Sequence, residues 1–253
     1  MNIYRSIELG TPILSELLSQ VSDLSELKFH YEPISEDHLL NGEYDLIELS
    51  ESQTQNIMKK FSMLDWEIQT SQAADCFIKQ HDHFKPCQMN AEVFRQCIEF
   101  QKIIVDISYC AVLIGDYSFV TTFAMMLGKL GYKKIYIVSI ENLFFGDRID
   151  NLKKVLFDIE LKQLSFDELA TIPDVASLLA IDFELDENAE VVEILTYFNF
   201  LSKNAIFFDM QGYINDSLTL EAEKVQLKVI NSLEFYITKY KLIQKKLNNR
   251  SKV

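Results

Sequence analysis

The chain has 253 residues, of which 48% are hydrophobic and 12% aromatic, enough to bury one large core or two smaller ones. The formal net charge of −14 argues against a surface that follows nucleic-acid phosphates, and only 7 glycines argue against phosphate-cradling loops. No 18-residue apolar stretch occurs, and the first 20 residues contain Arg5, Glu8 and Glu16. We therefore expect a cytoplasmic protein with neither nucleic-acid nor membrane partners.

Short apolar runs alternate with helical patterns in the first part of the chain. Strands are expected at 2–9, 27–34 and 43–49, and helices at 11–24, 35–41, 50–64 and 91–101. Residues 74–80 and 84–90 read as two arms of a hairpin around His81 and His83. Cys76 and Cys87 flank this tip, but their spacing fits no zinc finger, so we expect an exposed turn without a metal.

The second part continues the alternation. A β-α-β unit is expected from Cys110 to Ser139, followed by helices at 145–158, 188–201 and 217–226. Strands are expected at 205–210 and 228–232, and a long helix at 232–247, while 159–166, 167–172 and 176–183 form further segments of the same alternation. Strands separated by helices favour an α/β fold with a parallel sheet.

Three stretches carry a resemblance to a known family. They are "GTPILSELLS" (Gly10 to Ser19), "MNAEVF" (Met89 to Phe94) and "AIFFDMQGYINDSLTLEAEKV" (Ala205 to Val225). With the order of strands and helices, they resemble the shikimate dehydrogenases over nearly the whole chain. The resemblance implies an α/β substrate-type domain at 1–106 and 231–253, to which the C-terminal helix returns. It also implies a Rossmann-like domain at 107–230.

The same resemblance implies a substrate cleft between the two domains. The positions that match its lining are Ser15, Asp75, Asn90, Glu92, Gly212 and Lys239. Glu92 stands at the family's catalytic aspartate and Lys239 at a glutamine that touches substrate, so these two are the candidate catalytic residues of an eroded site. The family's catalytic lysine has no counterpart, because the nearest lysines, Lys59 and Lys60, lie two turns along the next helix.

The cofactor turn departs from the family pattern. Gly115 is followed by Asp116, Tyr117 and Ser118, where the family has further glycines. Asp116 places an anion where phosphate charge would sit, opposing the attraction of a helix N-terminus for phosphate. Ser139, Ile140 and Glu141 stand where NADP-dependent members carry N-R-T, whose arginine grips the 2′-phosphate, and Glu141 would suit an NAD ribose.

Two function hypotheses remain open. The first is a pseudoenzyme that has lost NADP binding and catalysis, needs no cofactor, and binds an unknown protein partner or a small ligand in the cleft between the domains. The second is a divergent oxidoreductase that uses NAD or NADP on a shikimate-like or other small polar substrate.

Overall fold

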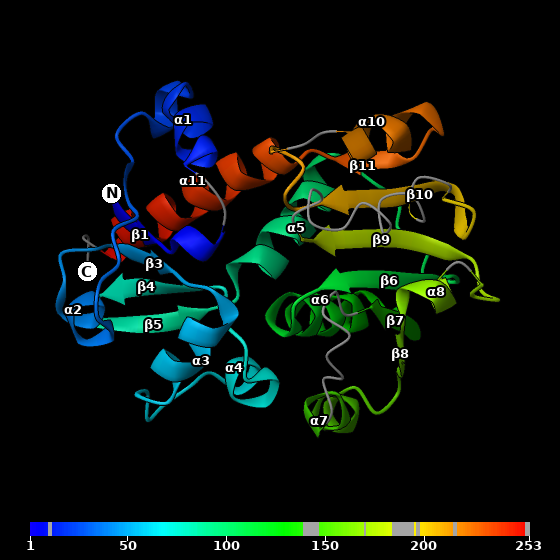
Figure 1. Cartoon of the computed structure of the whole chain (residues 1–253), viewed down its shortest axis with the longest axis horizontal. Helices are drawn as coiled ribbons and strands as arrows, with labels where there is room; N and C mark the ends of the chain where they lie inside the picture. The colour runs from blue at the N-terminus through cyan, green and yellow to red at the C-terminus, as the bar shows by residue number, and fades with distance from the viewer. Residues whose placement is uncertain are drawn as a thin grey trace. The chain divides into compact units, whose positions relative to one another are not determined.

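The structure is a computed structural model of the chain, and it describes residues 1–9, 12–138, 147–169, 171–183, 195, 198–214 and 217–250. Two compact units are present: unit 1 is Met1–Val93 with Phe235–Val253, and unit 2 is Phe94–Glu234 (Figure 1). The predicted two-domain α/β fold is confirmed, including the return of the C-terminal helix to unit 1. The units divide inside helix α5 (Met89–Phe100), whereas the sequence interpretation drew the boundary after it, at residue 106.

Unit 1 is built on a five-stranded sheet in the order β2-β1-β3-β4-β5. Its strands are β1 (Asn2–Arg5), β2 (Lys28–His30), β3 (Leu46–Glu48), β4 (Cys76–Gln80) and β5 (His83–Cys87). β1 pairs in parallel with β2 and β3, while β4 is antiparallel to β3 and β5. The predicted hairpin is therefore confirmed as β4 and β5, and His81 in its turn has a positive φ of 55°.

Helices flank this sheet and close its apolar core. They are α1 (Ile13–Ser19), α2 (Glu36–Asn41), α3 (Glu51–Met58), α4 (Trp66–Ser71) and α11 (Ser232–Arg250), with single 3-10 turns at Ile7–Leu9 and Ser22–Leu24. Ser50 begins α3 through a capping box with Gln53. Helix α4 has no counterpart among the predicted elements.

Unit 2 is a six-stranded sheet in which every neighbouring pair is parallel, in the order β11-β10-β9-β6-β7-β8. Its strands are β6 (Cys110–Gly115), β7 (Lys134–Val138), β8 (Glu160–Leu164), β9 (Ala176–Asp182), β10 (Leu201–Asp209) and β11 (Lys228–Ile230). The arrows of β6, β9 and β10 point the same way in Figure 1. This is the doubly wound 3-2-1-4-5-6 order of dinucleotide-binding sheets, whose direction reverses between β6 and β9.

Helices connect the parallel strands of unit 2. They are α6 (Tyr117–Leu130), α7 (Asp147–Val155), α8 (Phe166–Leu169) and α10 (Ser217–Lys224). Helix α6 is almost wholly apolar and is buried from Phe119 to Leu127. It ends at Gly131, whose φ of 106° is the left-handed conformation that favours glycine at a helix end. The helix predicted at 188–201 lies mostly outside the described residues.

Candidate functional site

The carboxyl end of β6 is where a sheet of this order binds phosphate, at the N-terminus of the helix that follows. Asp116 occupies that helix terminus. Its Oδ1 accepts a hydrogen bond of 2.7 Å from the backbone N–H of Phe119, so the side chain caps α6. The exposed Asp116 carboxylate therefore puts a fixed negative charge on the helix end that would otherwise attract an anion.

The ring of Phe119 covers the other half of this turn. A Cβ added to Gly115 would lie 2.7 Å from Phe119 Cδ1 and 3.2 Å from the carbonyl oxygen of Asp182. Gly115 is therefore required by close packing, and its φ is not in the left-handed region. Tyr117 and Phe119 are both buried, and the Phe119 ring packs at a tilt against Phe123, with ring centroids 4.3 Å apart. Tyr117 thus stands, buried, at the position that carries the second glycine in a dinucleotide-binding turn.

The other two residues predicted around the cofactor turn give less information. Ser118 lies in the first turn of α6, and its carbonyl oxygen accepts a hydrogen bond from the Thr122 hydroxyl. Glu141 lies outside the described residues.

In unit 1, a buried ionic cluster joins the carboxyl ends of β1 and β3 to α11. Glu48 accepts hydrogen bonds of 2.7 Å from Arg5 Nη1 and from the Tyr240 hydroxyl, and Lys239 Nζ lies 2.6 Å from Glu48 Oε1. Arg5, Glu48 and Lys239 are 3%, 1% and 2% exposed, so bulk water does not screen these charges. The ring of Tyr236 lies 5.7 Å from the Arg5 guanidinium and 5.9 Å from the Lys239 ammonium.

These contacts fix the protonation states of the cluster. Burial raises the pKa of Glu48, but the charges of Lys239 and Arg5 outweigh it, and the pKa falls to about 2. Burial lowers the pKa of Lys239, but the charges of Glu48 and Asp75 outweigh it, and its pKa lies above the ordinary value of 10.5. The candidate catalytic lysine is thus held as a buried, charged partner of Glu48.

Asp75 lies close enough to this cluster to interact with the charge of Lys239, and Asn90 contacts Asp75. The two carboxylate oxygens of Asp75 accept hydrogen bonds from the backbone N–H groups of Met89 (2.9 Å) and Asn90 (2.7 Å), which begin α5. Burial raises the pKa of Asp75, although the charge of Lys239 and these two N–H groups oppose the rise. Asp75 therefore holds the start of α5 and is electrostatically coupled to Lys239.

Glu92 and Ser15, also in unit 1, make separate local contacts. Glu92 Oε2 lies 2.7 Å from Lys246 Nζ, and both side chains are about one-third exposed. The Ser15 hydroxyl donates to the carbonyl oxygen of Pro12 at 2.6 Å, within the first turn of α1. The structure thus brings Asp75, Asn90 and Lys239 together and gives Glu92 a different lysine as its partner.

In unit 2, two carboxylates meet at the carboxyl ends of β9 and β10. Gln211 links them, because its backbone N–H donates to Asp209 Oδ1 (2.9 Å) and its Nε2 donates to Asp182 Oδ1 (2.8 Å). Burial raises the pKa of Asp209 to about 7, and the nearby charge of Asp182 adds to that rise. Gly212 follows, and its N–H donates to the carbonyl oxygen of Asp209 at 3.2 Å.

Solved structures share this two-unit arrangement. A quinate dehydrogenase from Corynebacterium glutamicum, in complex with NAD, matches with a TM-score of 0.68 and 11% identity, covering 94% of this chain and 89% of that one. Shikimate 5-dehydrogenase from Thermus thermophilus, in complex with NADP(H) and shikimate, matches with a TM-score of 0.66 and 12% identity, covering 97% and 92%. A chorismate mutase/shikimate 5-dehydrogenase fusion protein from Clostridium acetobutylicum gives 0.66 and 11%, covering 98% and 90%.

The chain has the fold of the shikimate and quinate dehydrogenases. The resemblance inferred from eroded motifs is confirmed at the level of the fold. Neither the protein-family models nor the curated protein sequences give a match.

Sequence reasoning missed four residues that shape these sites on the shikimate dehydrogenase fold: Arg5, Glu48, Asp182 and Tyr240. Arg5, Glu48 and Asp182 each end a strand that is otherwise apolar. A charged side chain within a buried strand needs a partner, because an unpaired charge is costly to bury. That signal would have nominated Arg5 and Glu48 as residues that each need a charged partner.

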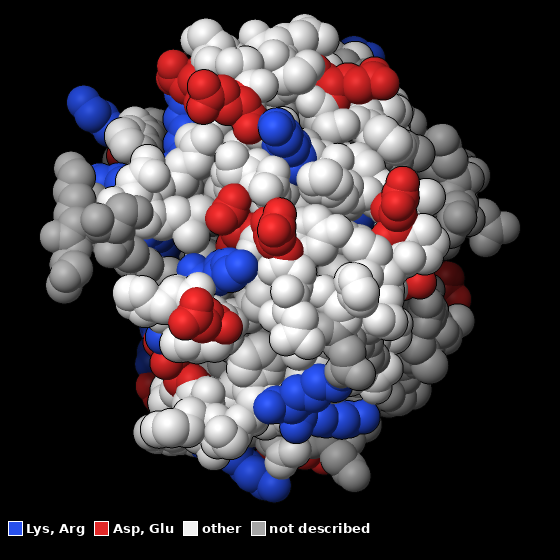
Figure 2. All heavy atoms as spheres, turned by 90° about the vertical axis from the view of Figure 1, so that its left-hand side faces the viewer, with Lys and Arg blue, Asp and Glu red and all other residues white. Residues whose placement is uncertain are grey.

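Metal ligands, membrane-spanning helices and surface charge are the remaining features of the described residues. Within the described ranges, no group of three or more His, Cys, Asp and Glu side chains is placed to hold a metal ion. No helix among those residues is both long enough and apolar enough to cross a membrane. Figure 2 shows acidic and basic side chains interspersed over one face of the molecule, without one continuous basic area.

Proposed function

We propose that this chain is a pseudoenzyme of the shikimate dehydrogenase fold, which binds neither NAD nor NADP and acts through a protein partner or a small ligand. The Asp116 cap on α6 carries the proposal. A dinucleotide bound in the usual way places its pyrophosphate at this helix end, where the Asp116 carboxylate already accepts the N–H of Phe119. Like charges brought together at one helix end repel, so the cap opposes dinucleotide binding.

The buried ionic cluster of unit 1 supports the loss of catalysis that the word pseudoenzyme implies. General acid–base catalysis works best when the pKa of the catalytic group lies near the operating pH. The pKa of Lys239 instead lies above its ordinary value, because Glu48 and Asp75 stabilise the ammonium. A lysine that remains protonated and ion-paired is a poor proton acceptor at neutral pH.

Dinucleotide binding is the decisive experiment. We would measure the unfolding temperature and the heat of titration of the whole protein with NAD, NADP and their reduced forms. A ligand present at 100 times its Kd stabilises a protein by about 2.7 kcal/mol, a readily measured shift. We expect no shift and no saturable heat, together with no change in absorbance at 340 nm on adding shikimate or quinate.

A matched pair of variants tests the reason for the loss. Asp116→Ser keeps a side chain that can cap α6 but removes the negative charge, whereas Asp106→Ser removes an exposed carboxylate elsewhere in unit 2. We expect only Asp116→Ser to gain weak dinucleotide affinity. Saturable binding of NAD or NADP by the unaltered protein would overturn the proposal and favour a divergent oxidoreductase.

A further inference from the structure

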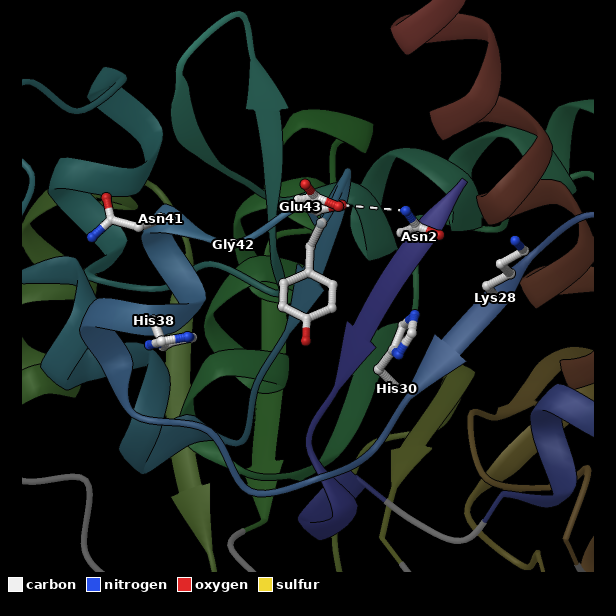
Figure 3. Close-up of a pocket in the computed structure, with 8 residues that line it drawn as sticks. Asn2, Lys28, His30, His38, Asn41, Gly42 and Glu43 are labelled. Carbon is white, nitrogen blue, oxygen red and sulfur yellow. Dashed lines mark hydrogen bonds between the residues drawn. The ribbon is translucent and has the colours of Figure 1, made fainter.

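A concave pocket lies wholly within unit 1, between the edge strand β2 and helix α2. It has a volume of about 800 Å³, within the range of small-molecule sites (Figure 3). Asn2, the first residue of β1, lines it, whereas Arg5 of the buried ionic cluster is the last residue of the same strand. This pocket is therefore separate from the Lys239 cluster and from the sites described above.

One wall of the pocket is aromatic. The ring of Tyr44 packs edge-on against the imidazole of His30, with centroids 5.5 Å apart, and lies 5.6 Å from the buried ring of Tyr4. His30 and Lys28 are two positions apart on β2, so they project from the same face of the strand. A planar group could therefore lie against Tyr44 and His30 while a polar group reaches Lys28.

The rest of the lining is rich in hydrogen-bond donors. Lys28 supplies an ammonium, His30 and His38 supply ring N–H groups, and Asn41 supplies an amide at the end of α2. No hydrogen bond or ion pair joins the side chains of Lys28, His30 and His38 to any other residue that the structure describes. Glu43 is the one acidic residue among the described side chains that line the pocket, in a protein whose net charge is −14. The pocket is thus a locally donor-rich site on an acidic protein.

We propose that this pocket binds a small organic anion, with its phosphate or carboxylate group on Lys28 and its planar part against Tyr44 and His30. Lysine is an established phosphate ligand, and hydrogen bonds between charged groups are about twice as strong as neutral ones. The aromatic wall adds apolar contact that inorganic ions cannot use.

Titration of the isotope-labelled whole protein, followed by ¹H–¹⁵N NMR, tests the proposal. The probes are phenyl phosphate and benzoate, which share a ring but differ in the anion, with sodium chloride as the reference for ionic strength. We expect saturable shifts of the backbone amides of Asn2, Lys28, His30 and Gly42, with a Kd on the order of 1 mM. Saturation by phenyl phosphate alone identifies a phosphate site, and saturation by benzoate alone identifies a carboxylate site.

Two variants of equal charge change separate specific binding from general electrostatics. Lys28→Met removes the proposed anion ligand, whereas Lys59→Met removes an exposed ammonium at the C-cap of α3, outside the pocket. Both side chains are exposed, so both variants should fold, and their amide spectra verify this. We expect Lys28→Met to raise the Kd roughly tenfold, the effect of losing one charged hydrogen bond, and Lys59→Met to leave it unchanged. Equal effects of the two variants, or shifts no larger than those with sodium chloride, would overturn the proposal.

Discussion

Replacing Lys239 by methionine should strongly destabilise unit 1. Methionine matches the length of the side chain but leaves Glu48 without its ammonium partner in a buried site. Removing one member of a buried ion pair typically costs 3–5 kcal/mol, because the other charge remains desolvated. The pKa of Glu48, about 2 against an ordinary 4.5, gives a similar scale: at 1.36 kcal/mol per pKa unit it corresponds to about 3 kcal/mol. Arg5 supplies part of this stabilisation, so we expect Lys239→Met to lower the free energy of unfolding by about 3 kcal/mol.

The assay is urea unfolding followed by fluorescence and circular dichroism. The chain has a single tryptophan, Trp66 in α4, so its fluorescence reports on unit 1. Lys246→Met is the matched control, because Lys246 is on the same helix and pairs with Glu92 at a site about one-third exposed. Exposed pairs contribute about 0–1 kcal/mol. A loss below about 1 kcal/mol in Lys239→Met, or equal losses in the two variants, would refute the reasoning.

Three further outcomes follow from the same geometry. Because the pKa of Glu48 in the folded protein lies below its ordinary value, its contribution to stability is complete above about pH 4.5 and is lost as pH falls towards 2. In Glu48→Gln, the urea concentration at the midpoint of unfolding, followed by Trp66 fluorescence, should therefore depend less on pH over that range. The pKa of Asp209 is raised to about 7, so the protein should lose stability as pH rises from about 4 to 7. Asp209→Asn should remove up to about 4 kcal/mol of that loss, measured by urea unfolding followed by circular dichroism. An unchanged dependence of the free energy of unfolding on pH would contradict this prediction. Gly115→Ala should cost about 1–3 kcal/mol in urea unfolding, because the added methyl group meets the Phe119 ring; full stability would show that the ring moves aside freely.

Much of the fold could be read from local patterns. The apolar strands, the hairpin and the alternation of strands and helices were predicted because each pattern repeats over a few residues. Helix α4 was missed because it is only six residues long and buries just two side chains, Ile68 and Ser71, too few to set up a clear helical pattern. The strand order was not a local property: β6 lies next to β9 and β7, and the resemblance rather than the periodicity implied that arrangement.

The sequence by itself determined that Gly115 is followed by an acidic residue and aromatic residues rather than by more glycines, and this already opposed a phosphate site. The tertiary structure decided what those residues do: Asp116 caps α6, and the Phe119 ring lies over Gly115. Only the tertiary structure joined Glu48 to Tyr240, which lies 192 positions further along the chain, and to Lys239, which precedes Tyr240 in sequence. The physical reason is that burying a charge requires a partner but does not specify where in the sequence that partner lies.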